Sequence, residues 1–218
     1  MVIIDAGHGG NDPGAQAFGV KEKDWALEVS LYQYHRLKEL GVPVKLTRDR
    51  DMTLSPSKRS SIVKNSGMNY CISNHFNAGG GSGCETIYSI FSNDRLAKAI
   101  ADAIAEKGMP FRRVFSKEGS DGRDYYFMHR LTGKVRTIIV EYGFLDNEGD
   151  FKRLNTKEKR ETYAEAVVQV LCNWLGKPYD KNNYGDQENL ALYRVQVGAF
   201  RDQSNAERLI KRLKEDGY

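Results

Sequence analysis

Short apolar runs alternate with amphipathic segments through the first two-thirds of the chain. The apolar runs predict strands at residues 2–5, 44–47, 70–73, 85–89 and 137–141. Segments with a repeat of three to four residues predict helices at 24–40, 57–65, 94–106 and 156–175. In the first helix, the apolar face is expected to consist of Leu27, Leu31, Tyr34 and Leu37. This alternation predicts an α/β fold with a mostly parallel, twisted sheet and helices on both of its faces.

The pattern changes near residue 177. Residues 177–189 (KPYDKNNYGDQEN) are polar and rich in turn-forming residues, which is typical of a linker. Beyond them, LYRVQVGAF alternates like a strand, and residues 204–217 repeat like a helix. We therefore expect a main domain at 1–176, a linker at 177–191 and a short C-terminal βα unit at 192–218. A unit of that length is too small to fold well alone.

Composition excludes several classes of protein. The 218 residues are 40% apolar and 28% charged, with a net charge of +4, which indicates a soluble globular chain rather than a disordered one. The mild positive charge favours an anionic partner but selects none. The three cysteines, Cys71, Cys84 and Cys172, are odd in number and far apart, so they are no disulfide framework. Neither a Gly-Lys-Ser/Thr loop nor a basic aromatic stripe is present, which argues against phosphate or nucleic-acid binding.

No export or membrane signal is visible in the sequence. The first residues lack a basic region followed by an apolar run, and no segment has the roughly 18 apolar residues that span a bilayer. We therefore expect a protein without a membrane span that is cytoplasmic at synthesis.

The first candidate chemistry lies in IIDAGHGGNDPGA, residues 3–15, where glycines follow the first predicted strand. A phosphate cradle, a metal site and a plain turn all fit such a stretch, but His8 interrupts the dinucleotide-binding pattern of glycines. His75, in CISNHFNA, also ends a predicted strand and leads into glycines. Because the carboxyl ends of parallel strands meet at one edge of a sheet, the two histidines are expected to be neighbours. For His129, in YYFMHRLTG, we favour a structural role over one in the cleft.

Two imidazoles and one carboxylate form a catalytic zinc site with an open position for water. A further carboxylate is needed to move the proton of that water. The acidic residues on offer are Asp5, Asp12, Glu22, Asp24, Glu85, Glu141 and Asp146. Glu141 is the clearest candidate, because it ends the apolar strand TIIVEYGF, where an uncompensated charge is costly. The residues alone do not single out Glu22. Asp5 is a candidate second-shell residue, which would orient a metal-binding histidine through a hydrogen bond.

Five segments together resemble one enzyme family, the zinc-dependent N-acetylmuramoyl-L-alanine amidases of the type-3 family. They are DAGHGGNDPGA (5–15), the Glu-Lys pair in GVKEKDWAL, TRDRD (47–51), SNHFNA (73–78) and EYGFLDN (141–147). Their order and spacing match the family over residues 1 to about 176. The sequence departs from the pattern at Asn74-His75-Phe76, where Ile-His-Ala is more common in the family.

The resemblance implies the site and the reaction. His8, Glu22 and His75 would bind one zinc ion, Zn²⁺, and Glu141 would be the catalytic acid and base. Apart from the resemblance, Arg59 and Asn77 are expected to contact the substrate. The bond expected to be hydrolysed is the amide between N-acetylmuramic acid and L-alanine in peptidoglycan. The alternatives are another zinc peptidase or amidohydrolase of the cell wall, and a non-catalytic wall-binding protein, against which the intact residue set argues.

The C-terminal unit resembles the first half of a SPOR peptidoglycan-binding domain, on the residues YRVQVGAFRDQSNAERLIKRLKEDGY. A half-domain implies either that the sequence is truncated at residue 218 or that a homodimer combines two halves. With peptidoglycan as the partner and no export signal, we expect an endolysin or autolysin. Such an enzyme would reach the wall after release by lysis or through a phage pore.

Overall fold

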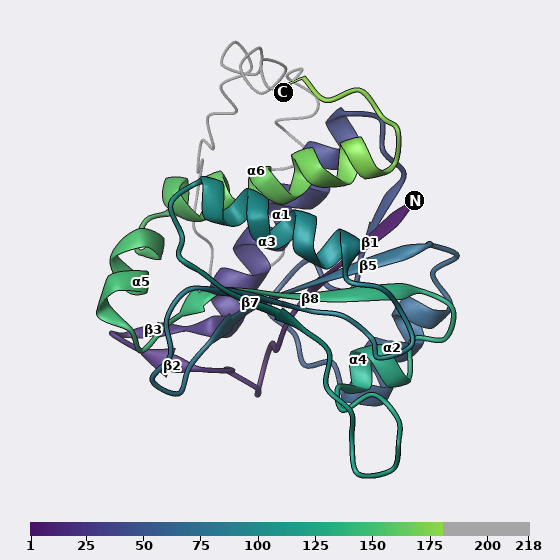
Figure 1. The fold of residues 1–218 in the computed structure, drawn as a ribbon, viewed down its shortest axis with the longest axis horizontal. Helices are drawn as coiled ribbons and strands as arrows, with labels where there is room; N and C mark the ends of the chain where they lie inside the picture. The colour runs from purple at the N-terminus through teal and green to yellow at the C-terminus, as the bar shows by residue number, and fades with distance from the viewer. Residues whose placement is uncertain (181–218) are drawn as a thin grey trace, which may run out of the picture. The chain divides into compact units, whose positions relative to one another are not determined.

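A computed structural model describes residues 1–180 of the chain. Six strands form its main sheet in the spatial order β4 (Val44–Leu46), β1 (Val2–Ala6), β5 (Tyr70–Asn77), β8 (Arg136–Phe144), β6 (Cys84–Ile87) and β7 (Phe111–Phe115) (Figure 1). A small hairpin, β2 (Gln16–Ala17) and β3 (Val20–Lys21), precedes the first helix. The helices are α1 (Glu22–Glu39), α2 (Pro56–Lys64), α3 (Arg95–Glu106), α4 (Phe127–Arg130), α5 (Glu148–Leu154) and α6 (Lys157–Trp174).

The sheet is mostly parallel, as the sequence predicts. Strand β1 pairs in parallel with β4 and β5, β5 with β8, and β6 with β7. The exception is β6, which runs antiparallel to β8. This pair places Glu85 directly opposite Glu141, and the β5–β8 pair places His75 on the other side of Glu141. The mixed pairing therefore brings three polar side chains into one row across the sheet.

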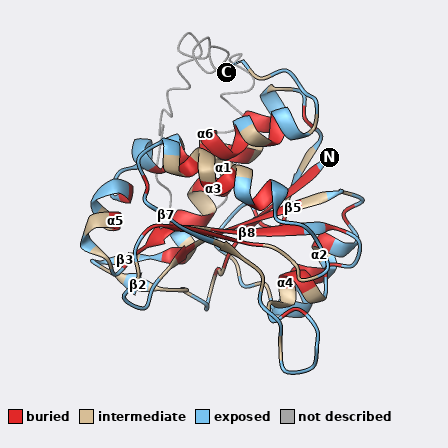
Figure 2. Ribbon diagram, in the orientation of Figure 1, coloured by how far each residue is buried: buried red, intermediate tan, exposed pale blue. Residues whose placement is uncertain are grey.

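Helices cover both faces of the sheet, also as predicted. Helices α1, α3 and α6 lie on one face, while α2 and α4 lie on the other (Figure 1). Successive strand residues point to opposite faces, so Ile4 joins the larger core and Ile3 joins the smaller one. The four inner strands, β1, β5, β8 and β6, are consequently largely buried on both sides (Figure 2).

The buried face of α1 differs from the predicted one. Leu27, Leu31 and Tyr34 are only half-buried, and the side toward the sheet carries Trp25, Ala26, Val29, Ser30, Gln33, Arg36 and Leu37. Hydrophobic periodicity misplaced this face because several of its residues are polar and have buried partners. Arg36, for example, donates through Nε to Glu165 of α6 at 3.0 Å.

A closed polar network joins α1 to the sheet. Asn74 donates to Ser30 Oγ at 2.9 Å and to Gln33 Oε1 at 2.8 Å. Gln33 donates to the Tyr142 hydroxyl at 2.8 Å, and that hydroxyl donates to Asn74 Oδ1 at 3.0 Å. Asn74 is one of the departures from the family pattern, and here it is satisfied by partners that an isoleucine would not need. The network fixes β5, which carries His75, against the helix that begins at Glu22.

Several short elements escaped the sequence analysis: the β2–β3 hairpin, β7, α4 and α5. The hairpin, α4 and α5 are too short for a clear hydrophobic period, and β7 (FRRVF) has two arginines where an apolar run would be expected. The three cysteines are buried and unpaired. Among residues 1–180, none of the helices is both long and apolar enough to cross a membrane. Most of the expected linker, and the whole unit expected at 192–218, lie outside the described residues.

Candidate metal centre

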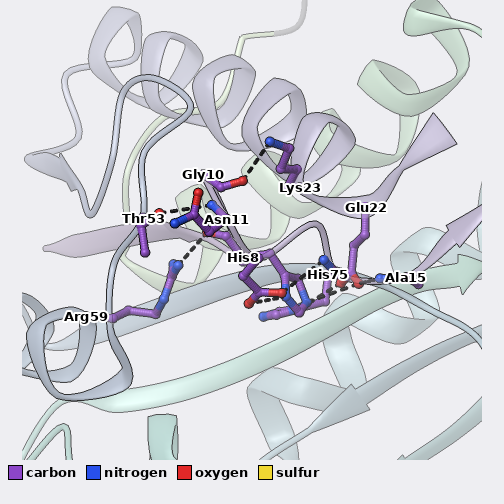
Figure 3. A network of polar contacts seen from close by, with 12 residues as sticks. His8, Gly10, Asn11, Ala15, Glu22, Lys23, Thr53, Arg59 and His75 are labelled. Carbon is purple, nitrogen blue, oxygen red and sulfur yellow. Dashed lines mark hydrogen bonds and ion pairs between the residues drawn. The ribbon is translucent and has the colours of Figure 1, made fainter.

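Three donor side chains converge at the carboxyl ends of β1 and β5. His8 follows β1, His75 lies near the end of β5, and Glu22 is the first residue of α1. His8 Nε2 lies 3.1 Å from Glu22 Oε2, and His75 Nδ1 lies 2.9 Å from Glu22 Oε1 (Figure 3). One nitrogen or oxygen atom from each residue falls within 4.8 Å of the others. The structure thus brings together the three residues that the sequence proposed as metal ligands, including Glu22.

Glu22 is held as a carboxylate. The backbone N–H of Ala15 donates to its Oε2 at 2.8 Å, and that of Phe76 donates to its Oε1 at 3.0 Å. Burial favours the neutral acid, but hydrogen bonds from His75 and His8 outweigh it and hold the pKa of Glu22 well below its ordinary value. Burial likewise disfavours protonation of the His8 ring, yet Glu22 and Asp12 raise the pKa of His8. The cluster therefore already stabilises positive charge, which a metal cation would supply.

Two glycines make room for the ligands. A Cβ on Gly7 would lie 2.4 Å from Cε1 of the His75 ring. A Cβ on Gly14 would lie 2.4 Å from Glu22 Oε2 and 2.7 Å from the His8 ring, and Gly14 also has a positive φ of 66°. His8 itself has a positive φ of 55°, which is uncommon for a residue with a side chain. The glycine-rich stretch therefore serves as a turn that presents imidazole and carboxylate groups.

Asp12 orients the His8 ring. Its Oδ2 lies 2.8 Å from His8 Nδ1, and its Oδ1 accepts a hydrogen bond from Gly14 N at 3.1 Å. This leaves His8 Nε2 to face Glu22, the arrangement in which outer acceptors fix metal-binding histidines. Sequence reasoning considered Asp12 without giving it this role. The signal that could have found it is the four-residue spacing from His8 across a glycine turn.

Asp5 lies one step further from the metal ligands than expected. It is fully buried and accepts hydrogen bonds from Thr47 Oγ1 at 2.6 Å, Ser73 Oγ at 2.6 Å and Arg59 Nη1 at 2.7 Å. Burial raises the pKa of Asp5, but Arg59 and the two hydroxyl groups bring it below its ordinary value. Within residues 1–180 the side-chain hydrogen bonds of Asp5 are with these groups and not with His8 or His75.

Arg59 points into the protein. Besides Asp5, its Nη groups donate to the carbonyl oxygens of Ala6 and His8. Arg48 does the same from the TRDRD segment, donating to the carbonyls of Ala6 at 3.0 Å and Gly7 at 2.8 Å. Both guanidinium groups are buried and hold the backbone that carries His8. The substrate contact predicted for Arg59 is therefore not the geometry that the structure shows.

A second clamp closes the outer side of the turn. Lys23 Nζ donates to Gly10 O at 2.9 Å (Figure 3). It also pairs with Asp51 at 2.6 Å, and Asp51 accepts from Gly10 N at 2.6 Å. Thr53 Oγ1 accepts from Asn11 N at 3.0 Å. Lys23, from the Glu-Lys pair, and Arg48 and Asp51, from the TRDRD segment, thus all hold the histidine turn.

Glu141 lies beside the donor cluster on β8. It is half-buried as a residue, but its Oε2 is shielded from solvent and has no hydrogen-bond partner among residues 1–180. Burial, and after it the negative charges of Glu22 and Glu85, raise the pKa of Glu141 well above its ordinary value. A buried carboxyl group that has one oxygen without a hydrogen-bond partner, and that lies next to three metal-ligand side chains, is suited to hold and transfer a proton.

Glu85, the other neighbour of Glu141, is already satisfied. It accepts from Asn77 Nδ2 at 3.0 Å, from Arg112 Nε at 2.6 Å and from Arg113 Nε at 2.8 Å. Asn77, predicted to contact substrate, is thus at the site with its amide nitrogen bound to Glu85. The two arginines were missed because β7 was not predicted.

His129 lies outside this cluster. It is a buried residue of α4 and lines a different hollow, with Ser89, Asn93, Lys134, Arg136 and Thr137. Burial lowers the pKa of His129 to about 4, against weaker opposing effects of Asp124 and two backbone carbonyls. The ring is therefore neutral near pH 7.

The donor set decides which chemistry fits. Two imidazoles and a carboxylate are a typical ligand set for catalytic zinc, which leaves one position open. The adjacent Glu141 adds a proton carrier, so the arrangement suits metal-assisted hydrolysis.

Comparison with known proteins gives a consistent picture. The family described as N-acetylmuramoyl-L-alanine amidase matches residues 2–173, and the SPOR domain matches residues 189–218. The N-acetylmuramoyl-L-alanine amidase CwlM of Bacillus licheniformis is 27% identical over 230 residues, covering 100% of this chain and 82% of CwlM. The sporulation-specific N-acetylmuramoyl-L-alanine amidase of Bacillus subtilis is 26% identical, with the same two coverages. Among solved structures, the catalytic domain of the amidase CwlV of Paenibacillus polymyxa has a TM-score of 0.73 at 25% identity, covering 81% of this chain and 98% of that domain.

Proposed function

The chain belongs to the N-acetylmuramoyl-L-alanine amidase family, and on that basis we propose that His8, Glu22 and His75 hold a single zinc ion for its reaction. The protein is an enzyme of this class, and it hydrolyses the amide bond between N-acetylmuramic acid and L-alanine in peptidoglycan. The observation that carries the metal assignment is the convergence of three ligand atoms within 4.8 Å, next to a carboxyl oxygen without a partner.

The residues divide the work as follows. A bound zinc ion would lower the pKa of water toward about 7 and polarise the scissile carbonyl. Glu141 takes a proton from the attacking water at Oε2 and returns it to the nitrogen that leaves with L-alanine. Asp12 keeps His8 in the tautomer that carries its proton on Nδ1 and leaves the lone pair of Nε2 free to bind a metal. Arg48 and Arg59 hold the turn in place. Positive charge held by His8, Glu22 and His75 would oppose the effect of Glu22 on Glu141 and would therefore lower the pKa of Glu141.

Digestion of purified peptidoglycan tests this proposal. We expect new amino termini of L-alanine, loss of activity with a chelator, and its return on addition of zinc. Glu141→Gln should retain zinc and lose hydrolysis by at least about 100-fold, the usual weight of a positioned acid and base. Glu148→Gln, an exposed carboxylate on α5, is the matched control and should behave like the wild type. Release of reducing sugars, or of other amino termini from the stem, would contradict the proposal.

We further propose that the segment matching the SPOR domain binds the wall and keeps the enzyme on its substrate. The comparisons support wall binding through this match. The homodimer expected from the short length of the segment falls outside the described residues, and no comparison supports it. The named relatives are bacterial amidases, one of them sporulation-specific, so we propose an autolysin that meets the wall after release by lysis. Wall sedimentation of the full chain and of a chain ending at residue 180 tests the binding role.

A further inference from the structure

We propose that Arg112 and Arg113, the arginine pair, bind a free carboxylate of the peptide stem beside Glu141. This inference rests on the proposed amidase function and names a part of the substrate that the metal centre does not explain. It also replaces Arg59, whose buried guanidinium is occupied by the protein, as the source of positive charge for the stem.

An irregularity between β6 and β7 creates the pair. Cys84 is aligned with Phe111, but Glu85 is aligned with Arg113, so Arg112 is an additional residue on β7. Such a bulge sets two residues of one strand against a single residue of its neighbour. Neighbouring strand residues normally point to opposite faces, yet here the Nε groups of both arginines reach the same Glu85 oxygen, at 2.6 Å and 2.8 Å.

The ends of both side chains are available. Each arginine donates to Glu85 through its Nε. Within residues 1–180, none of the Nη groups of the two arginines makes a hydrogen bond. The side chains are 40% and 53% exposed, whereas that of Glu85 is 2% exposed. Two guanidinium charges thus face one carboxylate, so the cluster has a net positive charge. The remaining N–H groups of each guanidinium form a fork of donors, which is the geometry that recognises carboxylates.

Aromatic rings limit the movement of the pair. The Arg112 guanidinium carbon lies 5.1 Å from the centre of the Phe144 ring, and that of Arg113 lies 4.0 Å from the Phe115 ring. Contact with the ring face stabilises a cation and lowers the entropy that binding would cost. The pair is therefore oriented before a ligand arrives.

The position of the pair matches the length of a short peptide. Across the sheet, His75, Glu141 and Glu85 lie in one aligned row, and the arginine pair follows on the next strand. With strands about 4.8 Å apart, this row spans about 14 Å from the metal ligands to the arginines. An extended peptide covers roughly 3.4 Å per residue. A carboxylate a few residues beyond the scissile bond therefore reaches the pair while the bond lies at the metal centre.

The rival explanation is that both arginines only neutralise Glu85. Two matched substrates separate the two explanations: muramoyl-L-alanyl tetrapeptides whose fourth residue ends in a free carboxylate, the acid, or in a carboxamide, the amide. We expect the wild-type enzyme to favour the acid in kcat/KM by about tenfold or more, the usual weight of a forked, charge-assisted contact. In Arg112→Gln/Arg113→Gln, the preference should fall toward one, mainly through a higher KM for the acid.

Arg136→Gln, which removes an arginine at the far end of β8, is the control and should keep the wild-type preference. An unchanged preference in the double variant, or an equal loss on both substrates, would overturn the inference in favour of a structural role. Circular dichroism and zinc binding confirm that the double variant is folded. If the wild-type enzyme with zinc cleaves neither substrate, the amidase proposal fails instead, so the two failures are distinguishable.

Discussion

Replacing Gly7 by alanine should dislodge a metal ligand without touching any ligand atom. The added Cβ would lie 2.4, 2.6 and 2.7 Å from three atoms of the His75 ring. Ordinary contact begins near 3.4 Å, so the ring or the strand must move by about 1 Å. The strand is fixed, because Gly7 N donates to Asn74 O at 3.1 Å and Gly7 O accepts from Arg48 at 2.8 Å. The ring therefore moves.

A displacement of about 1 Å is large for a metal ligand. Zinc–nitrogen bonds are about 2.0–2.1 Å long and tolerate deviations of about 0.2 Å. Gly7→Ala should therefore weaken zinc binding by more than the roughly 10- to 100-fold that loss of an outer acceptor costs. The crowding should also destabilise the metal-free protein by about 1–3 kcal/mol, which lowers Tm by about 2–4 °C for each kcal/mol.

Competition with a chromophoric chelator measures the zinc affinity, and thermal unfolding with and without zinc measures the stability. Gly149→Ala is the matched control, because it lies in α5 and its Cβ would approach only the ends of two side chains, at 3.2 Å and 3.3 Å. Wild-type zinc affinity in Gly7→Ala, with an unmoved His75 ring in its crystal structure, would refute the reasoning.

Three further predictions follow from the same contacts. Asp12→Asn should weaken zinc binding by about 10- to 100-fold in the chelator assay, because His8 Nδ1 loses its charged acceptor; an equal effect of Asp121→Asn would contradict this. Asn74→Leu should lower the free energy of unfolding in urea by about 1–3 kcal/mol for each buried partner left unpaired, such as the Tyr142 hydroxyl. His129 has a folded pKa of about 4 against 6.5 when unfolded, so between these values the unfolded chain binds the proton and stability falls as pH falls. His129→Gln should remove up to about 3 kcal/mol of this acid-induced loss of stability. If the free energies of unfolding of the wild type and of His129→Gln depend on pH in the same way, the prediction is wrong.

Family membership and fold class could be predicted from the sequence because both depend on patterns of residues that are close together in the chain. Apolar runs and helical periods located the long elements to within a few residues, except that β5 and β8 extend further toward the site. The two histidines and Glu141 could be proposed because each ends a strand, and strand ends of a parallel sheet meet at one edge. Glu22 needed the family motif, since nothing about its own neighbourhood in the chain marks it.

Local sequence patterns are thus sufficient to predict the long helices and strands and the residues of the motifs. Which groups those residues contact depends on how distant segments pack together in the folded protein. Arg59 points inward because it pairs with the buried Asp5, which is 54 positions away in the chain. Gly7 must be a glycine because the His75 ring occupies the space that a Cβ would need. The arginine pair forms because β7 has a bulge of one additional residue beside Glu85. These outcomes depend on strand pairing and register, which are fixed by contacts between distant segments and leave no periodic trace in the chain.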